Sequence, residues 1–139
     1  MKNSNDVSVN YEKFYTDDVS IHIPEIFSNK KIAKISVNKY WENAVDGFYN
    51  YQNCTHYLTC VQGSLRIVIA HDQGNNNYKF SQFFISGMDG KIIKVPTNTW
   101  FGIHNLNNNS SVLLAAKDKN DDNYERLSYK IFNWAAKRA

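Results

Sequence analysis

The chain has 139 residues, which is enough for one domain with a sizeable core and too few for two ordinary domains. Its net charge of +3, from 16 basic and 13 acidic residues, gives no reason to expect nucleic acid or an anionic membrane as a partner. Aromatic residues make up 14% of the chain while only 2 Pro and 6 Gly interrupt it, which favours a β-rich globular protein.

The amino terminus is polar over residues 1–6, and no apolar window approaches the roughly 18 residues that a membrane-spanning helix needs. We therefore expect a soluble, cytoplasmic protein. Cys54 and Cys60 are too few for a disulfide framework, and the strand-like run between them would hold them apart. Both cysteines are predicted to be reduced and structural.

Short strands separated by turns are expected along most of the chain. Residues 20–23 and 32–37 alternate apolar and polar side chains, as a half-buried strand does. Residues 57–61 and 65–70 are rich in β-branched and aromatic side chains, and Gln62-Gly63-Ser64 between them predicts a hairpin. Further strands are expected at residues 78–85, 92–95, 100–104 and 112–116.

Turns rich in Asn and Gly are expected at residues 72–77, 87–90 and 107–109. Asn suits such turns because it tolerates left-handed backbone angles. A short helix is expected only within residues 121–134, with Asp122 and Asn123 as caps and Glu125 in its first turn. Short strands at regular spacing predict an all-β fold of jelly-roll type, forming a single domain over residues 1–139.

The segment from Gly90 to Asn105 carries a pattern of turn residues. Gly90, Pro96 and Asn105 are in register with the second motif of the cupins, G(X)5PXG(X)2H(X)3N. Asn98 stands at the second Gly of that motif. Phe101 stands at its His, so a metal ligand is replaced by a ring with no lone pair to donate.

The first cupin motif, G(X)5HXH(X)3–4E(X)6G, can be placed by setting its final Gly at Gly63. Tyr49 and Tyr51 then stand at the two His positions and His56 at the Glu position. Asn43 replaces the opening Gly. A single His with two neutral phenols is a poor ligand set for a divalent metal at neutral pH, so no metal is expected.

Within the cupins, the chain resembles the dTDP-4-dehydrorhamnose 3,5-epimerase family and related short sugar-nucleotide isomerases. The similar segments are Glu25-Ile26-Phe27, Gly47 to Gln52, Gly63 to Asp72, Lys94-Val95-Pro96 and Trp100-Phe101-Gly102. The resemblance implies a cupin double-stranded β-helix that acts, without metal or other cofactor, as an isomerase or epimerase. The implied substrate is a keto-deoxysugar nucleotide, such as a dTDP-linked one, in deoxysugar or surface-polysaccharide biosynthesis.

The matched catalytic residues of that family are substituted in this chain. The family's proton-abstracting His is matched by Tyr49, and an Arg that helps to hold the sugar nucleotide is matched by Asp46. A Lys on the following strand is matched by His56, and the Asp that supports the catalytic His by Ile67. These changes leave a second hypothesis open, a non-catalytic cupin that binds a sugar, a nucleotide or a protein partner.

Strand alternation predicts the side chains of the pocket, namely Tyr49, Tyr51, His56, Leu58, Cys60, Ile67 and Phe101. His56 is the candidate base, because it is the pocket group expected to titrate near neutrality, and Tyr49 is the candidate acid. The candidate substrate-binding residues are Tyr51, Cys60, Phe101 and Trp100. The alternative is that these side chains simply fill the core, with His56 satisfied by a neighbour and Cys60 buried and inert.

The outer surface of the predicted barrel also carries expectations. His104 is offset by an odd number from Phe101 and should face outward. The resemblance implies a homodimer, for which the expected apolar face consists of Tyr57, Val61, Val68 and Ala70.

Overall fold

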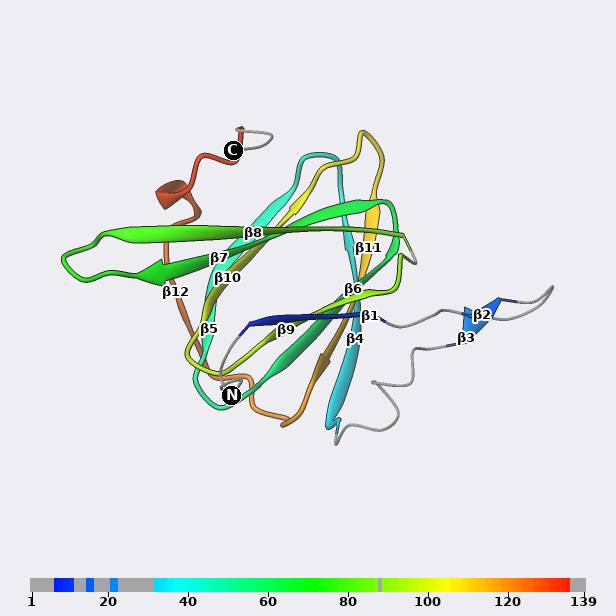
Figure 1. The fold of residues 1–139 in the computed structure, drawn as a ribbon, viewed down its shortest axis with the longest axis horizontal. Coiled ribbons are helices and arrows are strands. Elements are labelled where there is room, and N and C mark those ends of the chain that lie inside the picture. The colour runs from blue at the N-terminus through cyan, green and yellow to red at the C-terminus, as the bar shows by residue number, and fades with distance from the viewer. Residues whose placement is uncertain (1–6, 12–14, 17–20, 23–31, 88, 136–139) are drawn as a thin grey trace.

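Two antiparallel sheets build most of the molecule in the computed structural model, which describes residues 7–11, 15–16, 21–22, 32–87 and 89–135 (Figure 1). The first sheet has the spatial order β1 (Ser8–Tyr11), β9 (Lys91–Val95), β6 (His56–Gln62), β11 (Ser111–Lys117) and β4 (Lys34–Tyr40). The second has the order β12 (Tyr124–Arg126), β5 (Val45–Tyr51), β10 (Trp100–Asn105), β7 (Ser64–Asp72) and β8 (Tyr78–Ser86). β2 (Tyr15–Thr16) and β3 (Ile21–His22) form a separate pair.

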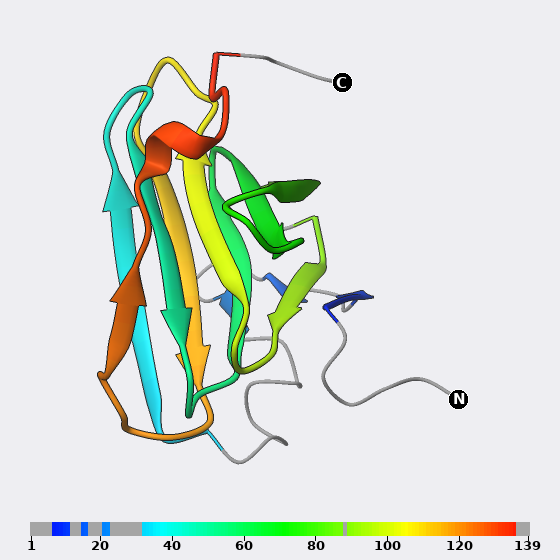
Figure 2. The same cartoon turned by 90° about the vertical axis from the view of Figure 1, so that its left-hand side faces the viewer.

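The all-β architecture confirms the predicted fold class. The strands expected at residues 57–61, 65–70, 78–85, 92–95, 100–104 and 112–116 all lie within observed strands. The strand expected at residues 32–37 begins two residues later, at Lys34, and the one expected at 20–23 falls partly outside the described residues. β11 pairs with β4, and β12 pairs with β5, beside which it lies in Figure 2.

The main core lies between the two sheets, where alternate side chains of both meet. Its buried members are Tyr40, Leu58, Cys60, Leu65, Ile67, Ile69, Ile85, Ile93, Val95, Phe101, Ile103, Leu113 and Ala115. A separate apolar cluster covers the outer face of the second sheet, where Trp134 packs on Phe48, Val68 and Ala70. The chain's last described segment thus closes a face that would otherwise be open to solvent.

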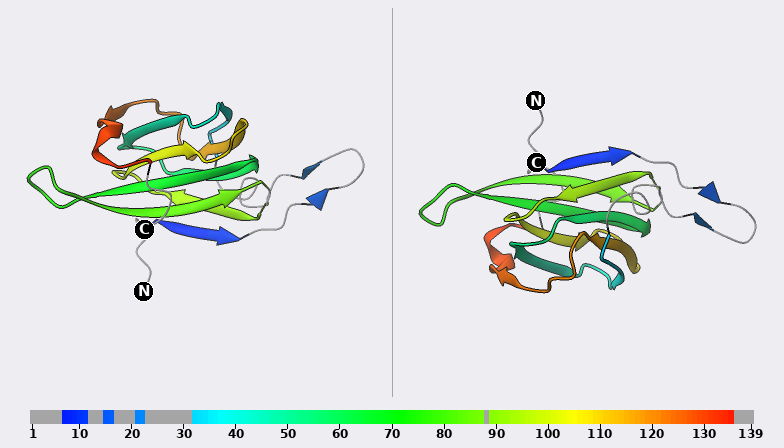
Figure 3. Two further views of the ribbon diagram at one scale, coloured as in Figure 1. Left: turned by 90° about the horizontal axis from the view of Figure 1, so that it is seen from above. Right: turned by 90° about the horizontal axis from the view of Figure 1, so that it is seen from below.

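The predicted turn at residues 72–77 joins β7 to β8 and confirms the Asn-rich turn signal. Gly74, Asn75 and Asn76 all have left-handed backbone angles there, with φ of 86°, 54° and 61°. The β7–β8 hairpin extends well beyond the other strands (Figure 3).

The hairpin predicted at Gln62-Gly63-Ser64 is wrong. β6 pairs with β9 and β11 in one sheet, whereas β7 pairs with β8 and β10 in the other. Gly63 instead turns the chain from one sheet to the other, with a φ of 87° and so little room that a Cβ there would lie 2.1 Å from Ser111 Oγ. Two strand-like runs with a glycine between them do not distinguish a hairpin from such a corner.

The helix predicted within residues 121–134 is reduced to one turn of 3-10 helix, Tyr129–Ile131. Its N-cap is Ser128, whose Oγ accepts a hydrogen bond from the Lys130 N–H, and not Asp122 or Asn123 as expected. Residues Tyr124–Arg126, expected in the first turn, form β12 on the edge of the second sheet. Because β5 still had an open edge, pairing with it satisfies the backbone of this segment better than an isolated short helix would.

Candidate functional site

A cavity of about 340 Å³ lies between the sheets, and we call it the barrel cavity. Its lining residues are Lys34, Ser36, Asn38, Tyr40, Asp46, Tyr49, Tyr51, His56, Leu58, Phe101, Ile103, Leu113, Ala115, Lys117, Asp122 and Tyr124. They come from β4, β5, β6, β10, β11 and β12 and from the loop that precedes β12. An apolar floor with a few convergent polar groups is the usual composition of a small-molecule site.

One wall of the barrel cavity is made by the polar side of β4. Lys34, Ser36 and Asn38 line the cavity, whereas Ile35 and Val37 on the opposite side of the strand are 46% and 67% exposed. The alternation at residues 32–37 predicted a strand correctly, but its polar side faces inward. Because a wet cavity solvates polar groups, the inner side of this edge strand need not be apolar.

A carboxylate and two phenols form a hydrogen-bonded group in the barrel cavity. The Tyr40 hydroxyl donates to Asp46 Oδ2 at 3.0 Å, and the Tyr49 hydroxyl donates to Asp46 Oδ1. Burial and the hydrogen bond from its hydroxyl to Asp46 raise the pKa of Tyr49 to about 12, and burial and the Asp46 charge raise the pKa of Tyr40. Both side chains therefore stay phenols at neutral pH and act as hydrogen-bond donors.

Strand alternation misses Asp46, because residues 46 and 49 of a regular strand point to opposite faces. The pairing of β5 with β10 shifts its register between Phe101 and Ile103, which lie opposite Tyr49 and Asp46. The shift brings both side chains to the cavity side, while Phe48 between them is fully buried on the outer face. The sequence signal for this irregularity is a glycine in each strand, Gly47 in β5 and Gly102 in β10, whose backbones approach so closely that a Cβ on Gly47 would lie 2.6 Å from Gly102 Cα.

His56 lies against the aromatic wall of the barrel cavity and is 6% exposed. Its ring centroid is 4.5 Å from that of Tyr51 and 5.2 Å from that of Phe101. Burial, helped by the nearby Lys117 charge, lowers the pKa of His56 to about 4, so its imidazole is neutral at neutral pH. Among the described residues, none makes a hydrogen bond with this imidazole, so a ligand or water can take up its donor and acceptor nitrogens.

The aromatic wall extends to the mouth of the cavity through Tyr124 of β12. The Tyr124 ring lies edge-on to Tyr49, with centroids 5.2 Å apart, and 5.1 Å from Tyr51. The Arg126 guanidinium lies 5.2 Å from the centre of the Tyr49 ring. Rings of this kind present flat faces that can stack on a base or a sugar.

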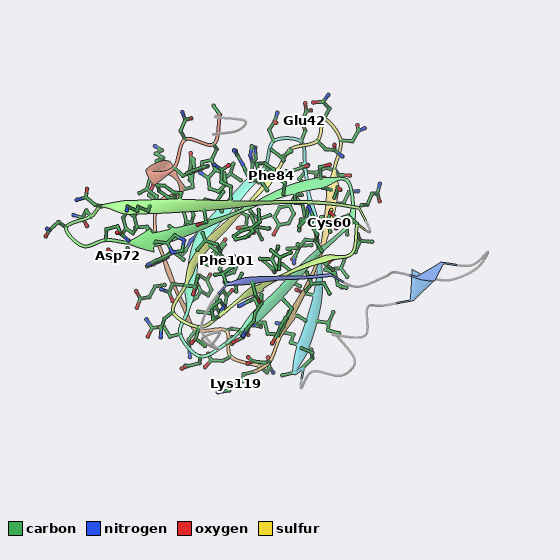
Figure 4. The ribbon with its side chains drawn as sticks, viewed as in Figure 1. Glu42, Cys60, Asp72, Phe84, Phe101 and Lys119 are labelled. Atoms are coloured by element: carbon green, nitrogen blue, oxygen red, sulfur yellow. The ribbon has the colours of Figure 1, made fainter. Side chains whose placement is uncertain are left out.

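Four of the six predicted site residues line the barrel cavity, namely Tyr49, Tyr51, His56 and Phe101. Figure 4 shows Phe101 within the interior. Cys60 is instead sealed in the main core at 0% exposure, and burial raises the pKa of its thiol to about 12. Trp100 is half-buried and packs against the outer cluster. No substrate contact is proposed for Cys60 or Trp100.

Besides Asp46 and the apolar Ile103, Leu113 and Ala115, the cavity is lined by residues that alternation did not assign to it, namely Lys34, Ser36, Asn38, Tyr40, Lys117, Asp122 and Tyr124. For β4 a usable signal existed, because every second residue from Lys34 to Asn38 is polar. For Lys117 the signal was the regular alternation of β11, continued one residue past the predicted end at 116. Asp122 and Tyr124 were assigned to a helix and so were not considered.

His104 faces away from the barrel cavity, as predicted, but it is covered and not exposed to solvent. Its Nδ1 lies 2.8 Å from Arg66 Nη2, and its ring stands edge-on to Trp134 at 5.7 Å. A second cavity of about 570 Å³ adjoins this group. It is lined by Asn43, Val45, Arg66, Phe84, His104, Leu106, Trp134 and Ala135.

Three of the four residues of the apolar face predicted for a homodimer are buried within the chain, and the fourth, Val61, is half-buried. Val68 and Ala70 are 0% and 4% exposed within the outer cluster that includes Trp134, and Tyr57 is 8% exposed in a cluster with Ile92 and Leu114. The homodimer itself stays a prediction, without this face to support it.

Two further searches of the described residues gave no candidates. Within the described ranges, no group of three or more His, Cys, Asp or Glu side chains is placed to hold a metal ion. In that same part of the chain, no helix has the length and apolar character needed to cross a membrane.

Comparisons with known proteins identify the fold. No protein-family model matches the sequence, and no curated protein is significantly similar to it. A dTDP sugar isomerase from Desulfovibrio desulfuricans is similar in structure with a TM-score of 0.77 and 12% identity, over 94% of this chain and 91% of that one. A dTDP-4-dehydrorhamnose 3,5-epimerase from Sulfolobus tokodaii matches with a TM-score of 0.74 and 12% identity, over 94% and 82% of the two chains.

A sugar 3,4-ketoisomerase from Thermoanaerobacterium thermosaccharolyticum, solved in complex with TDP, matches with a TM-score of 0.66 and 16% identity. That match covers 92% of this chain and 91% of the other. The chain therefore has the cupin-type jelly roll of the dTDP-sugar epimerases and isomerases, which confirms the resemblance seen in the sequence at the level of fold.

Proposed function

We propose that the chain is a metal-independent isomerase or epimerase that acts on a keto-deoxysugar nucleotide in the barrel cavity. The observation that carries the proposal is the neutral, buried His56 imidazole, which has no hydrogen-bond partner among the described residues and shares one cavity with the Tyr49 phenol. A base and an acid in one enclosed site are what proton transfer next to a ketone requires. Of the proteins of similar fold, one is a dTDP sugar isomerase and another is a sugar 3,4-ketoisomerase that was solved in complex with TDP.

The proposed chemistry moves one proton off carbon and one back. A nitrogen of His56 takes the proton from the carbon beside the ketone, and the electron pair of the broken C–H bond forms an enediol or enol. The Tyr49 hydroxyl, which donates its one proton to Asp46 in this structure, turns that proton to the ketone oxygen when the substrate binds and transfers it as negative charge develops there. Protonation of the same carbon on its other face by water, with the enol proton returned to Tyr49 and the His56 proton lost to solvent, gives an epimer. Transfer of the proton from His56 to the former ketone carbon, while the neighbouring hydroxyl gives its proton to the Tyr49 phenolate and becomes the new ketone, gives a ketoisomer.

The test is exchange of substrate protons with solvent deuterium. A dTDP-4-keto-6-deoxysugar is incubated with the protein in deuterium oxide, and loss of the proton signals beside the ketone is followed by NMR. We expect exchange with the wild type and a rate lowered about 100-fold or more in His56→Gln and Tyr49→Phe. The matched controls are His71→Gln and Tyr129→Phe, two exposed residues outside the barrel cavity, which should exchange at the wild-type rate.

A thermal-shift panel of dTDP, UDP, GDP and CDP would precede this assay, because a ligand that binds the native state raises the melting temperature. Binding of a nucleotide without any exchange would favour the second hypothesis, a non-catalytic cupin. The observation behind that hypothesis is the substitution of the matched catalytic residues, including the anionic Asp46 in place of a cation. If none of these compounds binds and none exchanges its protons, the proposal is overturned.

A further inference from the structure

Two lysines face each other across neighbouring strands at one end of the barrel cavity. Lys34 of β4 and Lys117 of β11 are direct antiparallel partners, and both line the cavity. The Cβ atoms of such a pair lie about 5 Å apart, and two like charges placed directly opposite each other repel. An arrangement of this kind needs an anion close by.

In this structure the anion is Asp122. Its Oδ1 accepts a hydrogen bond from Lys117 Nζ at 2.6 Å and lies 3.7 Å from Lys34 Nζ. The charge and hydrogen bond of Lys117, with the charge of Lys34, lower the pKa of Asp122. The Asp122 side chain is 70% exposed while that of Lys117 is 11% exposed, so a surface carboxylate pairs with a nearly buried lysine. Ion pairs with such an exposed partner exchange readily with water and other anions.

The neighbouring carboxylates are engaged elsewhere. Asp118 Oδ1 accepts the Thr55 N–H at 2.9 Å, and Asp121 Oδ2 accepts from Asn53 Nδ2 at 2.9 Å. These contacts fix the loop that leads from β11 to β12, which carries Lys119 and lies at the end of the molecule opposite Glu42 (Figure 4). Among the described acidic residues, Asp122 is the one within 4 Å of these two ammonium groups.

We propose that Lys34 and Lys117 bind the diphosphate of a nucleotide ligand, and that Asp122 occupies this site until the diphosphate displaces it. The identity of the ligand rests on the proposed function, whereas the anion site rests on the lysine pair. Lys117 is the cross-strand partner of His56, and its ammonium group lies 5.4 Å from the centre of the Tyr51 ring. A sugar attached to a diphosphate held by Lys117 would therefore lie beside the His56 imidazole.

The test is calorimetric titration with inorganic pyrophosphate, dTDP and thymidine at low ionic strength, where screening is weakest. Lys117→Met should weaken pyrophosphate and dTDP binding about tenfold or more, and Lys34→Met should weaken both by a smaller factor. The matched control is Lys119→Met, which removes an exposed lysine from the same loop. Thymidine has no phosphate, so its affinity should be the same in all of these proteins.

Asp122→Asn gives the sharper result, because it removes an exposed side chain that the core does not need. We expect pyrophosphate to bind several-fold more tightly, since the internal competitor is gone. Glu42→Gln removes the same charge at the opposite end of the molecule and controls for net charge. Equal affinities in Asp122→Asn and Glu42→Gln, or in Lys117→Met and Lys119→Met, would overturn the inference.

The deuterium-exchange assay separates this inference from the proposed function. Lysine-dependent pyrophosphate binding without proton exchange would keep the anion site and reject the isomerase. If protons exchange but the affinities for pyrophosphate and dTDP are unchanged in the Lys34, Lys117 and Asp122 variants, the isomerase is kept and the anion site is rejected. Absence of pyrophosphate binding by both the wild type and Asp122→Asn would reject the anion site.

Discussion

Asn105 connects the two turns at the end of the barrel that carries Glu42. Its side-chain amide donates to the carbonyls of Tyr40, Trp41 and Asn109, and its Oδ1 accepts from the Asn107 N–H and the Ser111 hydroxyl. The residue is fully buried, so removal of its amide leaves several polar groups without partners. The cupin motif position is thus occupied here for a structural reason.

We expect Asn105→Ala to lower the free energy of unfolding by about 3 kcal/mol. Urea unfolding followed by circular dichroism measures this change. Asn108→Ala, an exposed position in the same turn, should stay within about 0.5 kcal/mol of the wild type. Equal stabilities for the two variants would show that the Asn105 network contributes little.

His56 makes stability depend on pH. Its pKa of about 4 in the native state lies below the ordinary value of 6.5, so between these values the unfolded chain binds the proton and the native chain does not. The neutral His56 contributes its full stabilisation above pH 6.5, the ordinary pKa of histidine, and this contribution is lost as the pH falls towards about 4. The difference is on the order of 2 to 3 kcal/mol between about pH 7 and about pH 4.5.

The His56→Gln variant should lose less stability than the wild type over the same pH range, because glutamine does not titrate. Urea unfolding curves at both pH values, for both proteins, give the comparison. His71→Gln serves as the control, since this histidine lies at the exposed start of the β7–β8 turn. Parallel pH profiles for wild type and His56→Gln would mean that His56 is not desolvated as described.

At the scale of the element, the outer face of the second sheet depends on a glycine in β10. A Cβ on Gly102 would lie 2.9 Å from Trp134 Cη2 and 3.2 Å from Cζ2, so the indole packs directly on the glycine backbone. The indole is further held by the hydrogen bond from its Nε1 to the Tyr129 carbonyl at 2.7 Å. This contact attaches the carboxyl-terminal segment to the sheet.

We expect Gly102→Ala to destabilise the protein by about 1 to 3 kcal/mol, because the new methyl group displaces the Trp134 ring. A double-mutant cycle with Trp134→Leu checks the cause. The smaller side chain leaves room for the methyl group, so the combined loss should be less than the sum of the single losses. Strict additivity would place the effect of Gly102→Ala elsewhere in β10.

How much the sequence could predict also differs from element to element. The turn positions of the cupin motifs were readable because their backbone angles restrict the residue type. Asn43 and Asn98, which replace motif glycines, both have a φ of 58° and so keep the left-handed turn. The partner of each strand was less readable, since the runs around Gly63 are compatible with a hairpin and with a corner between sheets.

The site could be predicted only where strands are regular. Tyr49, Tyr51, His56 and Phe101 follow from alternation, and all four line the barrel cavity. Alternation does not predict Asp46, because its direction depends on the register shift where Gly47 of β5 meets Gly102 of β10. Asp122 could not be predicted either, because its contact with Lys117 depends on where β12 pairs with β5.

At the scale of the whole molecule, one set of residues determines the fold and another set determines the ligand. The apolar residues between the sheets specify the jelly roll, and such a core does not by itself determine function. The polar groups of the cavity come from β4, β5, β6, β11 and β12 and from the loop before β12. β4 and β12 are the edge strands of their sheets.

The inward polar side of β4 has a consequence for how this protein could change. Ser36 and Asn38 line the barrel cavity from an edge strand and belong to neither the main core nor the outer cluster. Substitutions there alter the shape and hydrogen bonding of the cavity with little loss of packed apolar area. A library randomised at these two positions should therefore yield mostly folded proteins with altered ligand choice, which makes β4 a natural starting point for the evolution of new specificities.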